Sequence, residues 1–308
     1  MRPLFRASSA VGGAALVLGL WAGGAPAFEP GAHVPYMAGV AGGVPIGVLP
    51  PPSFYVSSLT SYSQGTAHAD IEPRRPPGLA VFTEGLTLLW VPDLKILGAT
   101  YGVYAVQTLA VKTLSHIPPH DRASTETGLV NTVISPLNLA WKLPSDFYVS
   151  GRFNVQLQDG QYSRSNTLNI ANNFWTFEPN VGVSYLKGGL DLSLHLVYDI
   201  STENTNTRAL GSVDHKYQSG NVFTGEYSAT YAIGNWRWGL TGYGVAQTND
   251  DSAGGRTLKH TSLTRTGLGP IAEFNNKWVG INLYYTRDVA WSRAFGGDNF
   301  FFKVTVKF

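Results

Sequence analysis

The sequence contains no cysteine, which excludes a disulfide scaffold and thiolate metal sites. It is also poor in charge, with 14% charged residues in a chain of 308, whereas soluble domains have ~25%. After the first 27 residues no apolar run approaches the ~18 residues that a transmembrane helix needs. Glycine and aromatic residues are abundant instead: 35 Gly, 15 Tyr, 15 Phe and 8 Trp. We therefore expect a β-rich protein without membrane-spanning helices.

Residues 1–27 have the pattern of a cleavable signal peptide. They carry Arg2, Arg6 and no acid, then an apolar stretch from Val11 to Trp21, and end in Ala25-Pro26-Ala27. The stretch is short for a bilayer that needs ~20 residues, although an N-terminal membrane anchor remains the alternative. Cleavage would remove two of the 22 basic residues and leave 20 against 20 acidic ones. A mature chain without net charge argues against a nucleic-acid partner.

Residues 28–52 form a Gly/Pro-rich segment with few charges that closes with Pro50-Pro51-Pro52. This composition predicts irregular backbone. We expect the segment to fold into the lumen of the following domain as a possible plug, and a disordered periplasmic tail is the alternative. Residues 53–308 would then form that domain.

From Ser53 onward, apolar and polar residues alternate with period two. In the stretch 190–199 every even position is apolar, and 147–158 and 300–308 show similar two-faced patterns. Strands about ten residues long with unlike faces are typical of a membrane barrel with a wet lumen, whereas strands of a soluble sandwich average ~5–6 residues. The pattern predicts an all-β fold, a transmembrane antiparallel up-and-down β-barrel of about twelve strands.

Strand and loop lengths indicate how the barrel is oriented. We expect strands near 53–63, 79–90, 96–110, 128–141, 146–158, 174–186, 190–200, 221–232, 235–247, 264–274, 277–287 and 299–308. The connections alternate between long (64–78, 111–127, 159–173, 201–220, 248–263, 288–298) and short (91–95, 142–145, 187–189, 233–234, 275–276). Long extracellular loops, short periplasmic turns and both termini in the periplasm are typical of the bacterial outer membrane.

Aromatic residues concentrate near the expected strand ends, as in the two interfacial girdles of a membrane barrel. At the turn 233–234, a two-residue hairpin would pair Ala232 with Asn235 and place the apolar residues of both strands on one face. The chain ends on Phe308 after an alternating strand, a pattern that resembles the signal read by the barrel-assembly machinery. We therefore expect that machinery and outer-membrane lipid as partners.

Two motifs resemble the outer-membrane meta-pathway phenol-degradation family, whose members are porin-like β-barrels often called transporters. One is Pro50-Pro51-Pro52-Ser53-Phe54-Tyr55, soon after the Gly-rich segment, and the other runs from Gly128 to Trp141 with a Pro-Leu-x-Leu-x-Trp core. The likeness extends in layout over residues 30 to 308. It implies uptake of hydrophobic or aromatic compounds across the outer membrane, and no catalytic residues come with it.

The polar faces of the expected strands supply the candidate lumen-lining residues. They are Arg152, Asn154, Gln156, Glu178, Asp191, His195, Asp199, Glu226, Arg237, Arg265 and Glu273. Both signs of charge occur, and no level carries the single-sign ring that strong ion selectivity needs. We expect little net field and a path for neutral or weakly polar solutes. The alternative is that these groups only satisfy one another inside a plugged barrel.

Three prolines, Pro136, Pro179 and Pro270, fall in or at the edge of expected strands. Each removes a ladder hydrogen bond and so marks a bend or bulge. One hypothesis is that such a bend opens a lateral gap through which an apolar solute leaves the lumen for the bilayer. The alternative is a tolerated local kink.

No motif predicts catalysis, a cofactor or a metal site. Serine and histidine residues occur loosely in the long loops, but no G-x-S-x-G element is present. His116 and His120 have the closest spacing to a metal site, yet Pro118-Pro119 forbids the helix that would align them. We therefore expect no enzyme but a passive channel for small hydrophobic or aromatic compounds. A structural or adhesin-like barrel and an outer-membrane lipid hydrolase are the alternatives.

Overall fold

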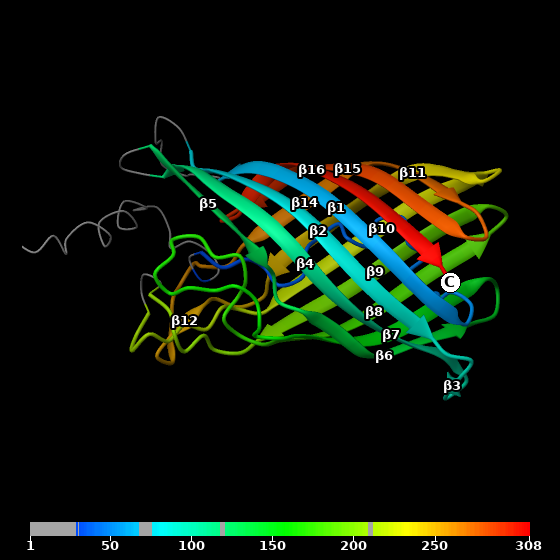
Figure 1. The fold of residues 1–308 in the computed structure, drawn as a ribbon, viewed down its shortest axis with the longest axis horizontal. Coiled ribbons are helices and arrows are strands. Elements are labelled where there is room, and N and C mark those ends of the chain that lie inside the picture. Colours follow the sequence, from blue (N-terminus) through cyan, green and yellow to red (C-terminus); the bar gives the residue numbers. More distant parts are fainter. Residues whose placement is uncertain (1–28, 30, 68–75, 118–120, 209–211) are drawn as a thin grey trace, which may run out of the picture.

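The computed structural model describes residues 29, 31–67, 76–117, 121–208 and 212–308, so the expected signal peptide lies outside the described residues. They form one large antiparallel sheet and a small hairpin (Figure 1). The strands are β1 (Ser53–Ala67), β2 (Gly78–Val91), β3 (Lys95–Ile96), β4 (Ala99–Ile117), β5 (Arg122–Leu129), β6 (Val133–Lys142), β7 (Phe147–Gln156), β8 (Thr176–Lys187), β9 (Leu190–Ser201), β10 (Val222–Ile233), β11 (Trp236–Gln247), β12 (Ser252–Ala253), β13 (Arg256–Thr257), β14 (Thr264–Asn275), β15 (Val279–Ser292) and β16 (Phe295–Lys307).

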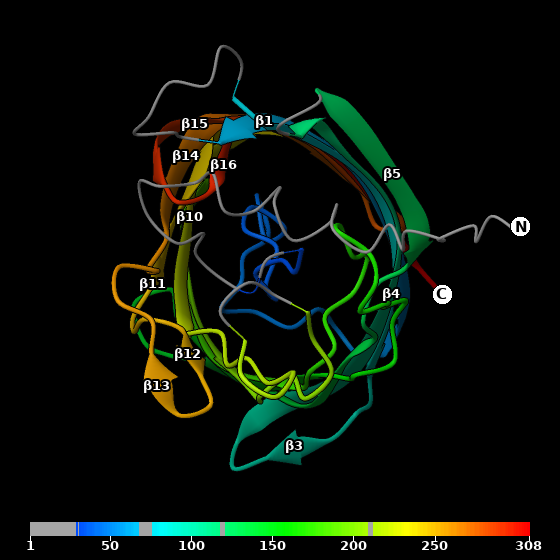
Figure 2. The same cartoon turned by 90° about the vertical axis from the view of Figure 1, so that its left-hand side faces the viewer.

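The large sheet closes on itself, because β2 pairs with β1 on one side and with β4 on the other (Figure 2). β5 and β6 both pair with β4 and together form one interrupted wall strand, while β3 is a short flap on β4. The wall therefore has twelve strands, all antiparallel, which confirms the fold class predicted from the sequence. Among the described residues no helix is long and apolar enough to cross a membrane.

The two faces of each wall strand differ in burial as the period-two pattern predicts. On β9, Asp191 and His195 point inward and are almost fully buried, while Leu192 and Leu194 between them are more than 40% exposed. Aromatic pairs such as Trp236 with Phe274 link neighbouring strands near their ends. The apolar face therefore points outward, as a lipid environment requires.

The predicted connections are right to within a few residues at one end of the barrel and partly wrong at the other. β4 continues to Ile117 where a loop over 111–127 was expected, and β15 and β16 are joined by residues 293–294 alone where a loop over 288–298 was expected. Strands can extend beyond the hydrocarbon region with polar residues on both faces, so the loss of alternation there misled the prediction. The long connections 157–175, 202–221 and 248–263 do lie together at one end (Figure 1).

The hairpin between β10 and β11 turns one residue later than predicted. Ile233 pairs with Trp236, so the turn is 234–235 and the predicted pair of Ala232 with Asn235 does not form. Gly234 has φ 63°, a left-handed conformation that glycine adopts without strain, which places the turn there. The shift preserves the faces, because Tyr231 now pairs with Trp238.

Residues 31–52 run through the interior of the barrel as irregular backbone without strands (Figure 2). Glu29 contacts the long connections at one end, and Ser53 begins β1 at the other. The segment is held together locally by turns, for example a hydrogen bond from the Ala32 amide to the Glu29 carbonyl of 2.9 Å. The lumen is therefore occupied along its length by the chain's own N-terminal segment.

Candidate functional site: the lumen and its N-terminal segment

All the lumen residues predicted from the sequence lie on the inner face of the wall. Most are buried below 6% exposure, and the three arginines keep partial exposure. Burial on the inner face of a barrel this wide requires a filling element, because twelve strands leave more space than side chains alone fill. The N-terminal segment (residues 31–52) supplies that element, and its contacts define the site. The transport role of the lumen residues stays a prediction.

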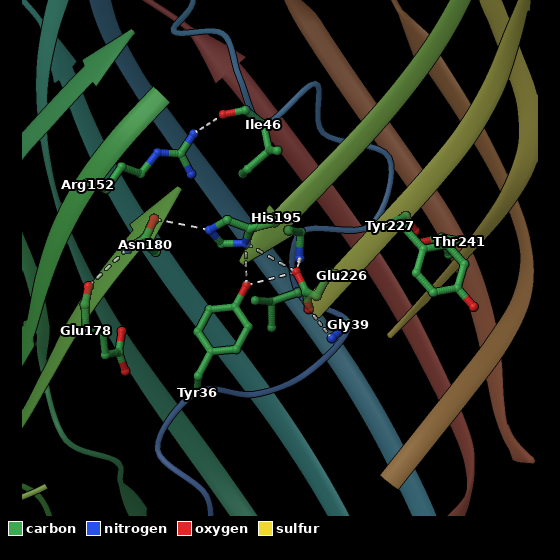
Figure 3. A network of polar contacts seen from close by, with 12 residues as sticks. Tyr36, Gly39, Ile46, Arg152, Glu178, Asn180, His195, Glu226, Tyr227 and Thr241 are labelled. Atoms are coloured by element: carbon green, nitrogen blue, oxygen red, sulfur yellow. Dashed lines mark hydrogen bonds and ion pairs between the residues drawn. The ribbon is translucent and has the colours of Figure 1, made fainter. Parts of the chain in front are cut away.

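The carboxylate of Glu226 on β10 holds residues 36–41 of the N-terminal segment (Figure 3). It accepts hydrogen bonds from the backbone amides of Gly39 and Ala41 (3.2 Å for Ala41) and from the Tyr36 hydroxyl at 2.9 Å. His195 Nδ1 lies 3.5 Å from the same carboxylate. Hydrogen bonds to an ionised group are about twice as strong as neutral ones, so one side chain fixes three donors of the segment.

A second attachment holds the segment nearer to β1, at Ile46 and Gly47. The Ile46 carbonyl accepts hydrogen bonds from Ser150 Oγ at 2.7 Å and from the Arg152 guanidinium. The Gly47 amide donates to Ser184 Oγ at 2.9 Å. The guanidinium has no carboxylate partner within ion-pair distance in the described structure. It donates hydrogen bonds to the Ile46 carbonyl and to the side-chain oxygen of Asn138 instead.

The outer end of the segment is tied to the long connections. Lys112 Nζ on β4 donates to the carbonyls of Asn169 (2.9 Å) and Ile170 (2.8 Å) and contacts His33 Nδ1 at 3.0 Å. Burial, reinforced by the Lys112 charge, holds the pKa of His33 well below its usual range. A neutral His33 can accept a hydrogen bond from the ammonium group, so Lys112 links the wall, a loop and the segment.

Apolar side chains of the segment pack at several levels of the lumen. Val34 and Ala38 join a cluster around Phe174, and Leu49 joins another around Tyr55. Gly39 has φ 100°, and a Cβ there would lie 2.8 Å from the Phe301 ring. Only glycine fits at that position, which explains in part why the segment is rich in this residue.

Beneath the segment, polar side chains of β7, β8 and β9 bond to one another. Glu178 accepts from Asn154 Nδ2 (3.1 Å) and from the Gln156 amide, and His195 Nε2 lies 3.1 Å from Asn180 Oδ1. These groups are buried, so hydrogen bonding is required to offset their desolvation. This arrangement satisfies the buried polar groups on this half of the wall with one another.

The inner faces of β1 and β2 differ from those of β8 to β10. They carry no charged residue, and several of their side chains keep partial exposure. These residues, with their neighbours on β4 and β16, are Ser57, Leu59, Thr87, Leu89, Val106, Thr108 and Thr305. The segment reaches this side through apolar side chains: Met37 Sδ lies 4.0 Å from Ser61 Oγ, and Leu49 packs with Tyr55 and Leu89. This side presents hydroxyl and aliphatic groups to the remaining lumen.

The three prolines predicted to open a lateral gap disturb the strand pairing to different degrees. Pro136 lies at register shifts in both the β4–β6 and β6–β7 ladders. Pro179 and Pro270 interrupt pairing on one side only. An apolar groove of about 290 Å³ lies beside Pro136, lined also by Trp90 and Tyr104. The gap itself stays a prediction.

The sequence analysis missed several residues that the structure brings into the site. Tyr36 was not singled out, because nothing in an irregular segment marks one residue over another. Lys303 and Lys307 stood on the polar face of the last strand but were not selected. Glu84 on β2 does not enter the site, because its side chain lies on the outer face, where it accepts hydrogen bonds from the hydroxyls of Ser58 and Thr60.

The weighed metal and hydrolase sites do not form among the described residues. His116 Nδ1 lies 2.6 Å from Asp121 Oδ1, and His120 is outside the described residues. No group of three or more potential metal ligands occurs in the part of the chain that is described. In the same residues, the contacts of His195 are Tyr36, Asn180 and Glu226, with no serine hydroxyl among them.

Comparisons with known proteins place the chain among outer-membrane barrels. It resembles the COG4313 outer membrane channel from Pseudomonas putida F1, with a TM-score of 0.70 and 14% identity over 85% of this chain and 97% of that one. It also resembles the β domain of the Bordetella autotransporter BrkA, with a TM-score of 0.50 and 12% identity over 83% and 99% of the two chains. No curated protein matches. At these identities the likenesses establish the fold.

A family model described as "Putative MetA-pathway of phenol degradation" matches residues 61–304, which is most of the barrel. The match confirms the family expected from the two motifs. A closed barrel with a greasy outer face and channel and autotransporter neighbours belongs in the bacterial outer membrane. The chain is therefore an outer-membrane β-barrel of the phenol-degradation MetA-pathway family.

Proposed function

We propose that the protein is a channel for passive uptake of small hydrophobic or aromatic compounds. The observation that carries this proposal is the unequal lumen. One side of the wall binds the N-terminal segment through charged and polar groups, and the opposite side, β1 and β2, is uncharged, partly exposed and contacted by apolar side chains of the segment. A neutral surface of hydroxyl and aliphatic groups imposes a smaller desolvation cost on an apolar solute than a charged one does. The family description supports a link to aromatic compounds.

In this proposal the N-terminal segment is the gate. Its attachments through Glu226, Ile46 and Lys112 are hydrogen bonds, each with a net strength of about 1–3 kcal/mol, so the segment can detach in part without unfolding the wall. Its apolar contacts at Val34, Ala38 and Leu49 return it to the closed position.

The lateral exit belongs to the proposal as its last step. The groove beside Pro136 faces the apolar outer surface, where Trp90 and Leu88 are exposed. We expect Pro136→Val to restore ladder pairing and lower uptake of apolar solutes. Pro179→Val, at a site without a register shift, is the matched control and should leave uptake unchanged.

The proposal is tested by solute flux. Purified protein in planar bilayers should conduct, and cells that express it should take up aromatic and long-chain compounds faster than cells that lack it. A structural or adhesin-like barrel would give neither result. Absence of both conductance and uptake would therefore disprove the channel.

A further inference from the structure

Acidic and basic side chains on the inner face differ in burial. The carboxylates of Glu178, Asp191, Asp199, Glu226, Glu273 and Asp288 are all at most 4% exposed. The basic residues Arg152, Arg237, Arg265, Lys303 and Lys307 keep partial exposure, and only Lys112 is buried. Glu126 on β5 is partly exposed, at the outer rim and beyond the closed part of the wall. Below that rim, the charge that a solute can reach is positive.

Among the described residues, Lys303 and Lys307 are the two of these cations whose side chains make no hydrogen bond or ion pair, and Lys303 lies deeper in the barrel because Lys307 is the last residue of β16. Arg237 donates to Thr230 Oγ1 and the Gly189 carbonyl. Arg265 is paired with Asp288 at 2.8 Å, and Arg152 is bound to the Ile46 carbonyl and Asn138. Lys303 Nζ makes no hydrogen bond or ion pair with the described residues. Glu226 and Glu273 interact with it electrostatically, but neither comes within ion-pair distance. The ammonium group thus keeps capacity for another partner.

The neighbours of Lys303 define what that partner would be. On β1, its cross-strand partner is Leu59, and the next inward pair toward the C-terminal end is Thr305 with Ser57. Beyond β1 lies the uncharged inner face of β2, with Thr87 and Leu89. A cation therefore borders an apolar and hydroxyl-bearing surface whose side chains keep partial exposure beside Met37 and Leu49 of the segment.

We propose that this lumen selects amphipathic organic anions, such as aromatic carboxylates, whose charged group binds Lys303 and whose apolar body lies along β1 and β2. This inference rests on the proposed function and narrows its solute class. Burial of these carboxylates removes the groups that would repel an anion. A cation of the same size would meet the Lys303 ammonium without a reachable carboxylate beside it.

The test is ion selectivity in planar bilayers. A gradient of potassium benzenesulfonate gives the permeability ratio of the aromatic anion to potassium from the reversal potential. The sulfonate stays ionised, so it does not cross the lipid as a neutral acid. We expect a ratio above one in the wild type, a decrease of about threefold in Lys303→Gln and a ratio below one in Lys303→Glu.

Lys95→Gln is the matched control, because Lys95 is an exposed lysine on the β3 flap outside the lumen, and its ratio should equal that of the wild type. Heat-modifiable migration on gels checks that each variant has formed a barrel. A conducting wild type with a ratio of one or less, or a Lys303→Gln ratio that does not fall, would overturn the anion selectivity and leave the channel intact. No conductance in any salt and no uptake by cells would instead reject the channel, and the selectivity with it.

Discussion

The inner faces of β8–β10 and of β1–β2 belong to the same closed sheet but have opposite chemistry. The first carries Glu178, Asp199 and Glu226, all buried beneath the N-terminal segment. The second carries no charge and keeps side chains such as Ser57 and Thr87 partly exposed. The difference shows that a barrel wall can confine the polar attachments of an internal segment to one part of its circumference.

Physical chemistry explains the division. A buried carboxylate needs several donors, and the backbone amides of an irregular segment provide them because no strand has consumed them. Glu226 with Gly39 and Ala41 shows this exchange. A wall of hydroxyl and aliphatic groups needs no such donors, so the segment contacts it through apolar side chains such as Leu49. In the proposed channel, solutes would pass on the side without these polar attachments.

The largest effect should come from removing the segment. Deletion of residues 36–47 eliminates the contacts of Tyr36 and Gly47 with the wall, and we expect single-channel conductance to rise by roughly threefold, because twelve strands enclose more space than side chains fill. Heat-modifiable migration controls for barrel formation. Unchanged conductance in a folded deletion variant would mean that the segment does not limit the passage.

A smaller effect should follow when one attachment is removed. Glu226→Ala leaves the amides of Gly39 and Ala41 without an acceptor and weakens closure by about 2 kcal/mol or more. We expect openings to become at least ~10-fold more frequent in bilayer recordings. Glu203→Ala, at a partly exposed loop position, is the control. Equal opening frequencies in both variants would contradict the role of Glu226.

Sequence periodicity predicts the wall well and the interior poorly. Alternation in stretches such as 190–199 identifies strands and faces, because one side meets lipid and the other does not. It failed at 111–117 and 288–292, where strands leave the hydrocarbon region and the contrast between faces is lost. It also placed Glu226 on the inner face without revealing Tyr36 as its partner, since pairing with an irregular segment leaves no periodic signal.

On the uncharged side, a bulkier side chain should narrow the passage. Thr87→Leu adds volume to the partly exposed inner face of β2, and we expect uptake of aromatic solutes to fall about twofold, with little change in stability. Thr266→Leu makes the same change on the exposed outer face of β14 and should leave uptake unaltered. Equal uptake by the two variants would show that the passage does not follow β1 and β2.

The smallest effect should come from the outer end, where Glu29 is buried and accepts hydrogen bonds from Asn204 at 2.8 and 2.9 Å. Burial raises the pKa of Glu29 above its usual 4.5, against the lowering effect of hydrogen bonds from Thr207, Asn204 and Tyr162. A raised pKa stabilises the attached state below the usual value, and this stabilisation is lost as pH rises through the shifted pKa. Openings should therefore become more frequent from acid to neutral pH.

Replacement of Glu29 by glutamine removes the titrating group but keeps a similar shape. We expect Glu29→Gln channels to open equally often at acid and neutral pH, at the frequency that the wild type shows in acid, because the amide mimics the protonated carboxyl. Glu203→Gln should retain the pH dependence of the wild type, since Glu203 is a partly exposed loop residue that does not contact the segment. Openings that are more frequent in acid would show that the segment is attached by the ionised form of Glu29, and burial would then be the weaker of the two influences on that carboxyl.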